Sequence, residues 1–134
     1  MIKLTNLTAQ TVQPGESVTF STIMRKSGCA ECFRLGTGSV KLCKRPATYE
    51  AYFQANVTTE TVGIAQLSFA LSGDVLSEST VVRQITTANA FDSISLQDLI
   101  SVNCCDFDRI TVTNTGALPV VISTNPLFYV KRIS

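Results

Sequence analysis

The sequence contains no histidine and no tryptophan. Without histidine, the chain lacks the commonest general base and the commonest metal ligand, so an enzyme would have to rely on carboxylates or a cysteine. Charged residues are also scarce at 16%, and a formal net charge of +1 gives no overall attraction to nucleic acid. These absences predict a non-enzymatic protein with no nucleic-acid partner.

Long apolar segments are missing as well. No run approaches the roughly 20 apolar residues of a membrane helix, so we expect no membrane insertion. The segment 1–8 has neither the apolar core nor the cleavage pattern of a signal peptide. Five cysteines are present, and this odd number without a signal peptide argues against a secreted disulfide framework.

The residues that are present indicate β structure. A length of 134 residues suits a single domain, 1–134. A mean hydropathy of +0.24 is apolar for a small domain, and surplus apolar surface often becomes a subunit interface. Short segments rich in Val, Ile, Thr and Ser alternate with turn residues, and no segment has a convincing helical period. The pattern predicts an all-β antiparallel sandwich.

Turn signals divide the chain into short strands. The polar segment 25–31 is expected to be a loop, and Gln97-Asp98 is expected to bend the long strand that contains it. The expected strands are 3–9, 17–24, 33–35, 39–44, 49–57, 63–71, 75–76, 79–86, 91–102, 109–115, 119–124 and 127–133.

The strand at 49–57 is apolar on both faces. Alternation places Tyr49 and Phe53 on one face and Tyr52 on the other. The last strand, 127–133, has the same property, whereas 63–71 looks solvated on one side. An antiparallel sandwich in which one sheet is covered on both faces explains the difference, and the simplest cover is another subunit.

Several motifs, taken in order, carry a resemblance to a known family. They are Tyr49-x-x-Tyr-Phe, Gly63-x-Ala-x-Leu-x-Phe-x-Leu-x-Gly-Asp, Asp108-x-Ile-x-Val-x-Asn-x-Gly and the final Val130-Lys-Arg-Ile. The chain resembles the jelly roll of tumour necrosis factor and the complement head. It is most similar to small cysteine-bearing versions from bacteriophages and prophages of gut bacteria, through Lys-Leu-Cys43 and Val-Asn-Cys104-Cys105.

The resemblance implies a jelly roll of about ten strands that assembles as a homotrimer without catalytic activity. The first, last and tyrosine-bearing strands would lie near the threefold axis. We therefore expect the trimer interface to contain four residues: Tyr52, Gln54, Leu127 and Tyr129.

The role that the resemblance implies is structural. We expect a capsid-decorating or head-fibre domain, made in the bacterial cytoplasm and carried on the virion surface, with other virion proteins or a host-surface ligand as partners. Three alternatives stay open: a bacterial or spore-surface adhesin head, the ligand-binding module of a secreted complex, and a small enzyme that uses a cysteine thiolate.

The cysteines have three interpretations. In a jelly roll of this order the thiols gather at one end of the sandwich. A zinc site could use Cys29, Cys32, Cys43 and either Cys104 or Cys105. Disulfides, for example from Cys43 to the 104–105 pair, are favoured over zinc, and reduced thiols that pack as small apolar residues are the third interpretation. No other cofactor is expected.

Two charged clusters are expected to lack a binding role. Lys41, Lys44 and Arg45 have no interleaved aromatic residues for base stacking, so we interpret them as a solvated rim. The aspartates at 92, 98, 106 and 108 do not match a twelve-residue calcium loop.

Overall fold

A computed structural model describes residues 1–28, 30–33, 36–103 and 109–134. Within these ranges the chain is all β apart from one 3-10 turn, η1 (Ser77–Ser79). The strands are β1 (Ile2–Thr5), β2 (Gln10–Val12), β3 (Thr22–Lys26), β4 (Glu31–Phe33), β5 (Val40–Leu42), β6 (Ala47–Thr58), β7 (Gly63–Leu71), β8 (Asp74–Val75), β9 (Val81–Ile85), β10 (Asp92–Val102), β11 (Arg109–Asn114), β12 (Val120–Ile122) and β13 (Leu127–Arg132). This architecture confirms the predicted antiparallel jelly-roll sandwich.

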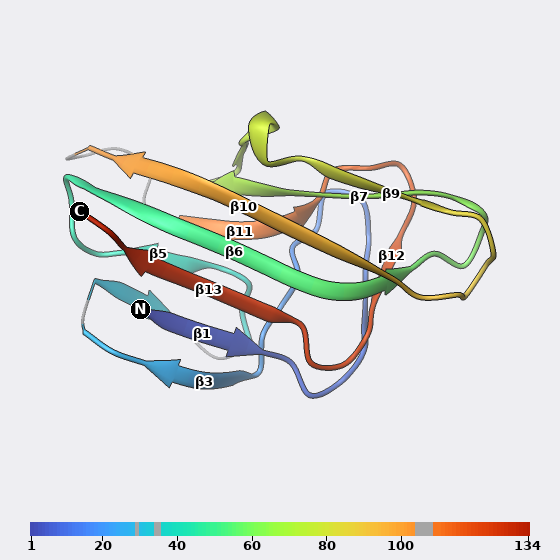
Figure 1. The fold of residues 1–134 in the computed structure, drawn as a ribbon, viewed down its shortest axis with the longest axis horizontal. Helices are drawn as coiled ribbons and strands as arrows, with labels where there is room; N and C mark the ends of the chain where they lie inside the picture. The colour runs from blue at the N-terminus through green and yellow to red at the C-terminus, as the bar shows by residue number, and fades with distance from the viewer. Residues whose placement is uncertain (29, 34–35, 104–108) are drawn as a thin grey trace.

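The strands form two antiparallel sheets that face each other (Figure 1). In the β6 sheet, β10 pairs with one edge of β6 along its length, while β13 and β12 share the other edge. β1 and β3 continue this sheet beyond β13, and β2 continues it beyond β12. The β7 sheet has the order β4-β5-β11-β7-β8, with β9 also paired to β7.

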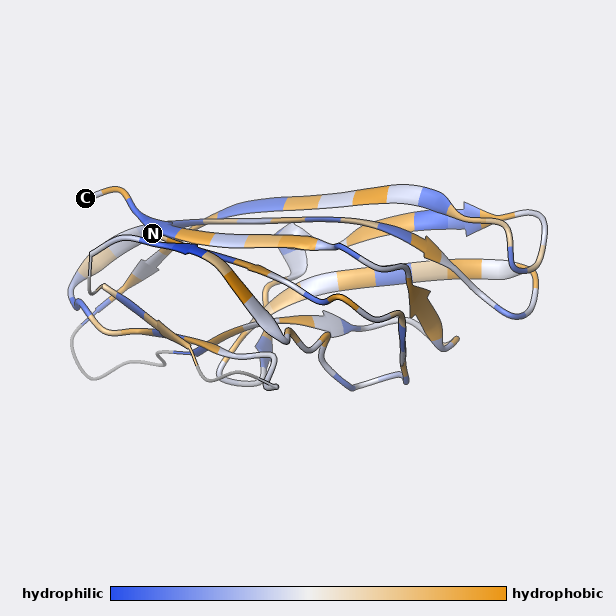
Figure 2. Ribbon diagram, turned by 90° about the horizontal axis from the view of Figure 1, so that it is seen from below, coloured by the Kyte–Doolittle hydropathy of each residue, from blue (hydrophilic) through white to orange (hydrophobic). Residues whose placement is uncertain are grey.

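The core lies between the two sheets, where alternate residues of each strand point inward. Figure 2 shows the layers edge-on, with apolar and polar residues alternating along the long strands. Five large aromatic side chains are fully buried: Phe20, Tyr49, Phe53, Phe69 and Phe128. The Phe128 ring stacks against Phe20 at 5.2 Å and Phe69 at 6.0 Å, so it joins the two sheets. The inward placement of Tyr49 and Phe53 is as the alternation predicts.

Several sequence-based boundaries differ from the structure. The first expected strand, 3–9, is too long: β1 ends at Thr5, and a turn in which Asn6 accepts hydrogen bonds from Thr8 precedes β2 at Gln10. The loop expected at 25–31 is wrong at both ends, because β3 extends to Lys26 and β4 begins at Glu31. Ile23 is exposed on β3, the outermost strand of its sheet.

The bend expected at Gln97-Asp98 is absent. β10 pairs with β6 without a register shift from Asp92–Val57 to Val102–Ala47. Unbroken pairing keeps the alternation of β10 intact, so Gln97 and Leu99 point outward while Asp98 points toward the inner side.

The turn after β11 is fixed by a buried asparagine. Asn114 is fully buried, and its Nδ2 donates to the carbonyl oxygens of Val12 at 2.9 Å and Leu118 at 2.8 Å. Its Oδ1 accepts from the Gly116 N–H at 2.9 Å. A Cβ at Gly116 would lie 3.0 Å from Gln66 Cβ, so the turn has little room for a side chain. The Asn-x-Gly motif therefore connects β2, β11 and β12.

The β7 sheet is less solvated on its outward side than its pattern predicted. Ser68 faces outward from β7 yet is fully buried. Its hydroxyl lies within hydrogen-bond distance of Thr80 Oγ1 and Thr115 Oγ1, at 2.7 and 2.9 Å. The segments around these two threonines cover this part of the sheet.

Candidate interaction surface

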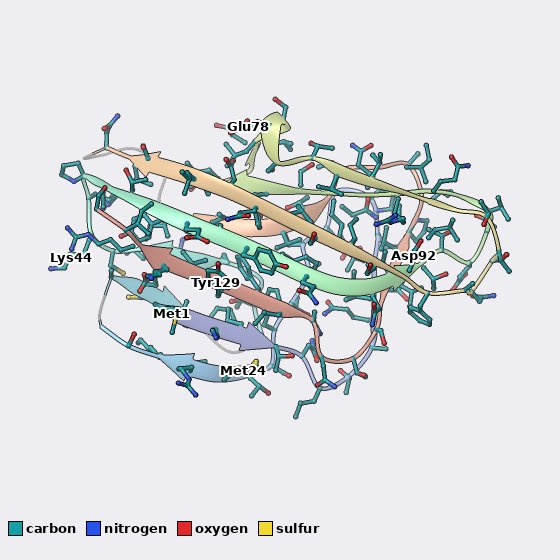
Figure 3. All side chains as sticks on the ribbon, viewed as in Figure 1. Met1, Met24, Lys44, Glu78, Asp92 and Tyr129 are labelled. Carbon is teal, nitrogen blue, oxygen red and sulfur yellow. The ribbon has the colours of Figure 1, made fainter. Side chains whose placement is uncertain are left out.

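The outward side of the β6 sheet carries a band of aromatic and polar side chains. We call it the tyrosine face, and it consists of Glu50, Tyr52, Gln54, Gln97, Leu99, Leu127 and Tyr129. Figure 3 labels Tyr129 on the side of the molecule turned toward the viewer. These residues point away from the core because their chain neighbours, such as Phe53 and Phe128, point into it.

Strand register brings the four expected interface residues into one patch. Tyr52 is the direct partner of Tyr129, and Gln54 is the direct partner of Leu127. The two tyrosine rings stack at 5.4 Å with an interplanar angle of 23°. Stacked pairs of this kind contribute about 0.5–1.5 kcal/mol beyond the area they bury. The sequence had placed these residues on one face, and the register makes them adjacent.

Both tyrosine hydroxyls donate to neighbours within the band. Tyr52 Oη donates to Gln54 Oε1 at 2.8 Å, and Tyr129 Oη donates to Glu50 Oε1 at 2.6 Å. Gln97 Nε2 donates to the same Glu50 oxygen at 3.3 Å. These bonds fix the orientation of both tyrosine side chains, so the tyrosine face is an ordered surface.

Glu50 sets the ionisation of Tyr129. The hydrogen bond to Glu50, the burial of the phenol and the negative charge of Glu50 together raise the pKa of Tyr129 to about 12. The phenol therefore remains a neutral donor throughout the ordinary pH range.

Three members of the tyrosine face, Glu50, Gln97 and Leu99, were not among the expected interface residues. Gln97 and Leu99 belong to it because β10 is unbroken, and Leu99 is 61% exposed beside Glu50, its cross-strand partner. Every second residue of β10 is apolar and buried, at Ile94, Leu96, Ile100 and Val102. This alternation was the sequence signal that could have assigned Gln97 and Leu99 to the outward side. A large exposed leucine next to stacked aromatic rings extends the apolar part of the surface.

A second feature of β10 is a carboxyl pair at its open edge. The Oδ2 atom of Asp98 is buried and has no hydrogen-bond partner among the described residues. Burial, followed by a hydrogen bond and repulsion from Glu78, raises the pKa of Asp98. Protonation of Asp98 would give its carboxyl a donor toward Glu78, which is labelled at the upper edge of Figure 3.

The structure describes two of the five cysteines. Cys32 is exposed on β4, and Cys43 is half-buried just after β5, where its N–H donates to the Ala30 carbonyl at 2.7 Å. Cys29, Cys104 and Cys105 lie outside the described residues. Within the described ranges no group of three potential metal ligands gathers. The choice among zinc, disulfides and reduced thiols stays a prediction.

A buried carboxylate links β4 to the start of β1 and the end of β13, which lie side by side at one end of the β6 sheet. Glu31 is 1% exposed, and its Oε2 forms an ion pair with the Met1 amino group at 2.8 Å. Its Oε1 accepts from the Arg132 N–H at 2.9 Å. Because both oxygens have partners in the core, Glu31 is part of the fold and is not a candidate catalytic acid.

Solved structures share this fold across nearly the whole chain. The globular domain of zebrafish complement 1qA is similar with a TM-score of 0.64 and 15% identity, over 99% of this chain and 96% of that one. Murine APRIL at pH 5.0 is similar with a TM-score of 0.65 and 16% identity, over 97% and 96%. The fold is a jelly roll of the TNF/C1q kind.

A phage protein has the same architecture. The PRD1 vertex protein P5 is similar with a TM-score of 0.54 and 12% identity, over 99% of this chain and 96% of that chain. No protein-family model matches the sequence, and no curated protein matches it either. Among the described residues, no helix is long and apolar enough to cross a membrane.

Proposed function

We propose that the chain is a non-enzymatic head domain that assembles as a homotrimer through the tyrosine face. The observation that supports this proposal most directly is the stacked Tyr52–Tyr129 pair on the outward side of the β6 sheet, with the exposed Leu99 close by on β10. Aromatic residues are enriched at subunit interfaces, and a rigid stacked pair loses little conformational freedom on association.

The electrostatics of the tyrosine face suit burial. Glu50 already accepts hydrogen bonds from Tyr129 and Gln97, so its carboxylate would not enter an interface without donors. Each tyrosine hydroxyl also has an acceptor within its own subunit. Association therefore need not leave these buried polar groups unpaired.

The proposed role of the trimer is that of a virion surface protein, which decorates the capsid or forms the tip of a head fibre. The phage vertex protein among the similar structures supports this role. In this role the trimer would bind other virion proteins or a host-surface ligand. The complement and APRIL structures support a binding head in general, and the virion is the particular setting proposed.

Light scattering coupled to size-exclusion chromatography tests the assembly. The expected particle has three times the 14.5 kDa chain mass, and a stable monomer at micromolar concentration would contradict the trimer. Antibody labelling of virus particles from the cells that express the chain tests the setting. Particles without label would contradict the virion role.

A further inference from the structure

A shallow pocket opens on the β7 sheet, on the opposite side of the sandwich from the tyrosine face. Its volume is about 390 Å³, at the small end of the range for small-molecule sites. We call it the Lys41 pocket. The described residues that line it are Cys32, Phe33, Thr37, Ser39, Lys41 and Arg109, and none of them is acidic.

The two cations of the pocket are direct cross-strand partners. Lys41 on β5 pairs with Arg109 on β11, and both point outward because Leu42 and Ile110 fill the core. Like charges directly opposite each other in an antiparallel pair are destabilising. Among the residues that the structure describes, no carboxylate forms an ion pair with either side chain. An anion between them would remove the repulsion.

The remaining lining residues extend this charged centre. Cys32 pairs with Lys41 from the other side, so a thiol, an ammonium and a guanidinium form a row across β4, β5 and β11. Ser39 lies on the same side of the chain as Lys41, and its hydroxyl has no hydrogen-bond partner among the described residues. Phe33 is half-buried, with its ring edge-on to Phe20 at 6.4 Å.

We propose that the Lys41 pocket binds a sulfate or phosphate group, either as the free anion or as an ester on a sugar-sized molecule. Arg109 presents the planar N–H fork that matches such oxyanions, and Lys41 adds a point charge. The Ser39 hydroxyl donates to a remaining oxygen. The volume exceeds that of one anion, so the exposed part of Phe33 contacts the carrier of an esterified group.

Titration of the protein with inorganic phosphate, followed by amide NMR spectra, tests the proposal. Saturable shifts are expected in β4, β5 and β11, with a Kd on the order of 1 mM for an open site. The variant Lys41→Gln/Arg109→Gln should bind at least about tenfold more weakly, because each charge-assisted hydrogen bond contributes on that scale. The matched control Arg25→Gln/Lys26→Gln removes two exposed charges from β3 and should bind as the parent does.

Two results would overturn the proposal. One is the absence of saturable shifts around the pocket, and the other is equal affinity in the Lys41→Gln/Arg109→Gln variant. Parent-like amide spectra of that variant without phosphate establish that its fold is intact. A parallel titration with glucose 6-phosphate separates the two sources: tighter binding than inorganic phosphate identifies an ester, and equal binding identifies the free anion. The pocket is remote from the tyrosine face, so these results do not depend on the trimer.

Discussion

Tyr52 and Tyr129 are direct partners across β6 and β13, and their rings stack at 5.4 Å on the outward side of the sheet. Neighbouring residues anchor both hydroxyls, so the pair is held in one orientation. An ordered aromatic pair on the outward side of a sheet suits a subunit interface, where aromatic residues are enriched. The pair is therefore the centre of the proposed interface.

Replacing Tyr52 by Asp should dissociate the trimer before the domain unfolds. The substitution removes the ring that stacks on Tyr129 and would bury an unpaired carboxylate in a closed interface. Light scattering should show a shift to monomer in a protein that still melts cooperatively. Val82→Asp, at a position on β9 that is 56% exposed, is the matched control and should remain trimeric. A Tyr52→Asp protein with unchanged mass and melting would refute the assignment of the face.

The phenol of Tyr129 should lose its proton at a higher pH than an ordinary tyrosine, because the hydrogen bond to Glu50 and burial raise its pKa to about 12. The raised value means that the folded state holds this proton more tightly than the unfolded chain. This stabilisation is complete below the ordinary tyrosine pKa near 10 and is lost as the pH rises through about 12.

The ultraviolet absorbance of tyrosine changes when the phenol ionises. The difference between the pH titrations of the parent and of Tyr129→Phe therefore isolates the ionisation of Tyr129. Glu50→Gln should lower the pKa of Tyr129, because a neutral amide accepts a weaker hydrogen bond from the phenol and no longer repels the phenolate. An unchanged titration in Glu50→Gln would show that the carboxylate does not cause the shift.

Asp98→Asn should stabilise the protein near neutral pH. Burial and Glu78 raise the pKa of Asp98, so ionisation of Asp98 costs folding free energy as the pH rises from its ordinary pKa through the raised one. An asparagine removes this cost and keeps the acceptor for the Leu99 N–H, which lies at 2.9 Å.

Thermal melts as a function of pH test this prediction. The gain in Tm should be present at pH 7 and should vanish below about pH 4, where the carboxyl is protonated in both states. Asp74→Asn removes the same charge from exposed β8 and should show no comparable pH-dependent gain. A constant difference at all pH values would contradict the ionisation argument.

Asn114→Ala should destabilise the fold by about 2–3 kcal/mol, the scale for leaving buried backbone groups unsatisfied. The affected groups are the carbonyls of Val12 and Leu118 and the N–H of Gly116. Urea unfolding measures the change, and Asn103→Ala, at an exposed position, should be nearly neutral. A neutral Asn114→Ala would show that the turn does not depend on these bonds.

Local alternation determined much of this protein. It predicted the β7 strand at its observed bounds, Gly63–Leu71, and it separated Tyr49 and Phe53 from Tyr52. These predictions hold because consecutive side chains of a strand must point to opposite faces, which is a property of neighbouring residues alone. The jelly-roll fold class followed from the same patterns and from the resemblance they carry.

Only the tertiary structure decided which residues meet. The register of β13 on β6 stacks Tyr52 on Tyr129, and the register of β5 on β11 sets Lys41 against Arg109. The unbroken pairing of β10 turns Asp98 inward at a point where a bend was expected. Register depends on contacts between segments far apart in the chain, and a shift of one residue would reverse every face. The sequence therefore specified the faces of individual strands, whereas strand register within each sheet brought together the residues of the two proposed binding surfaces.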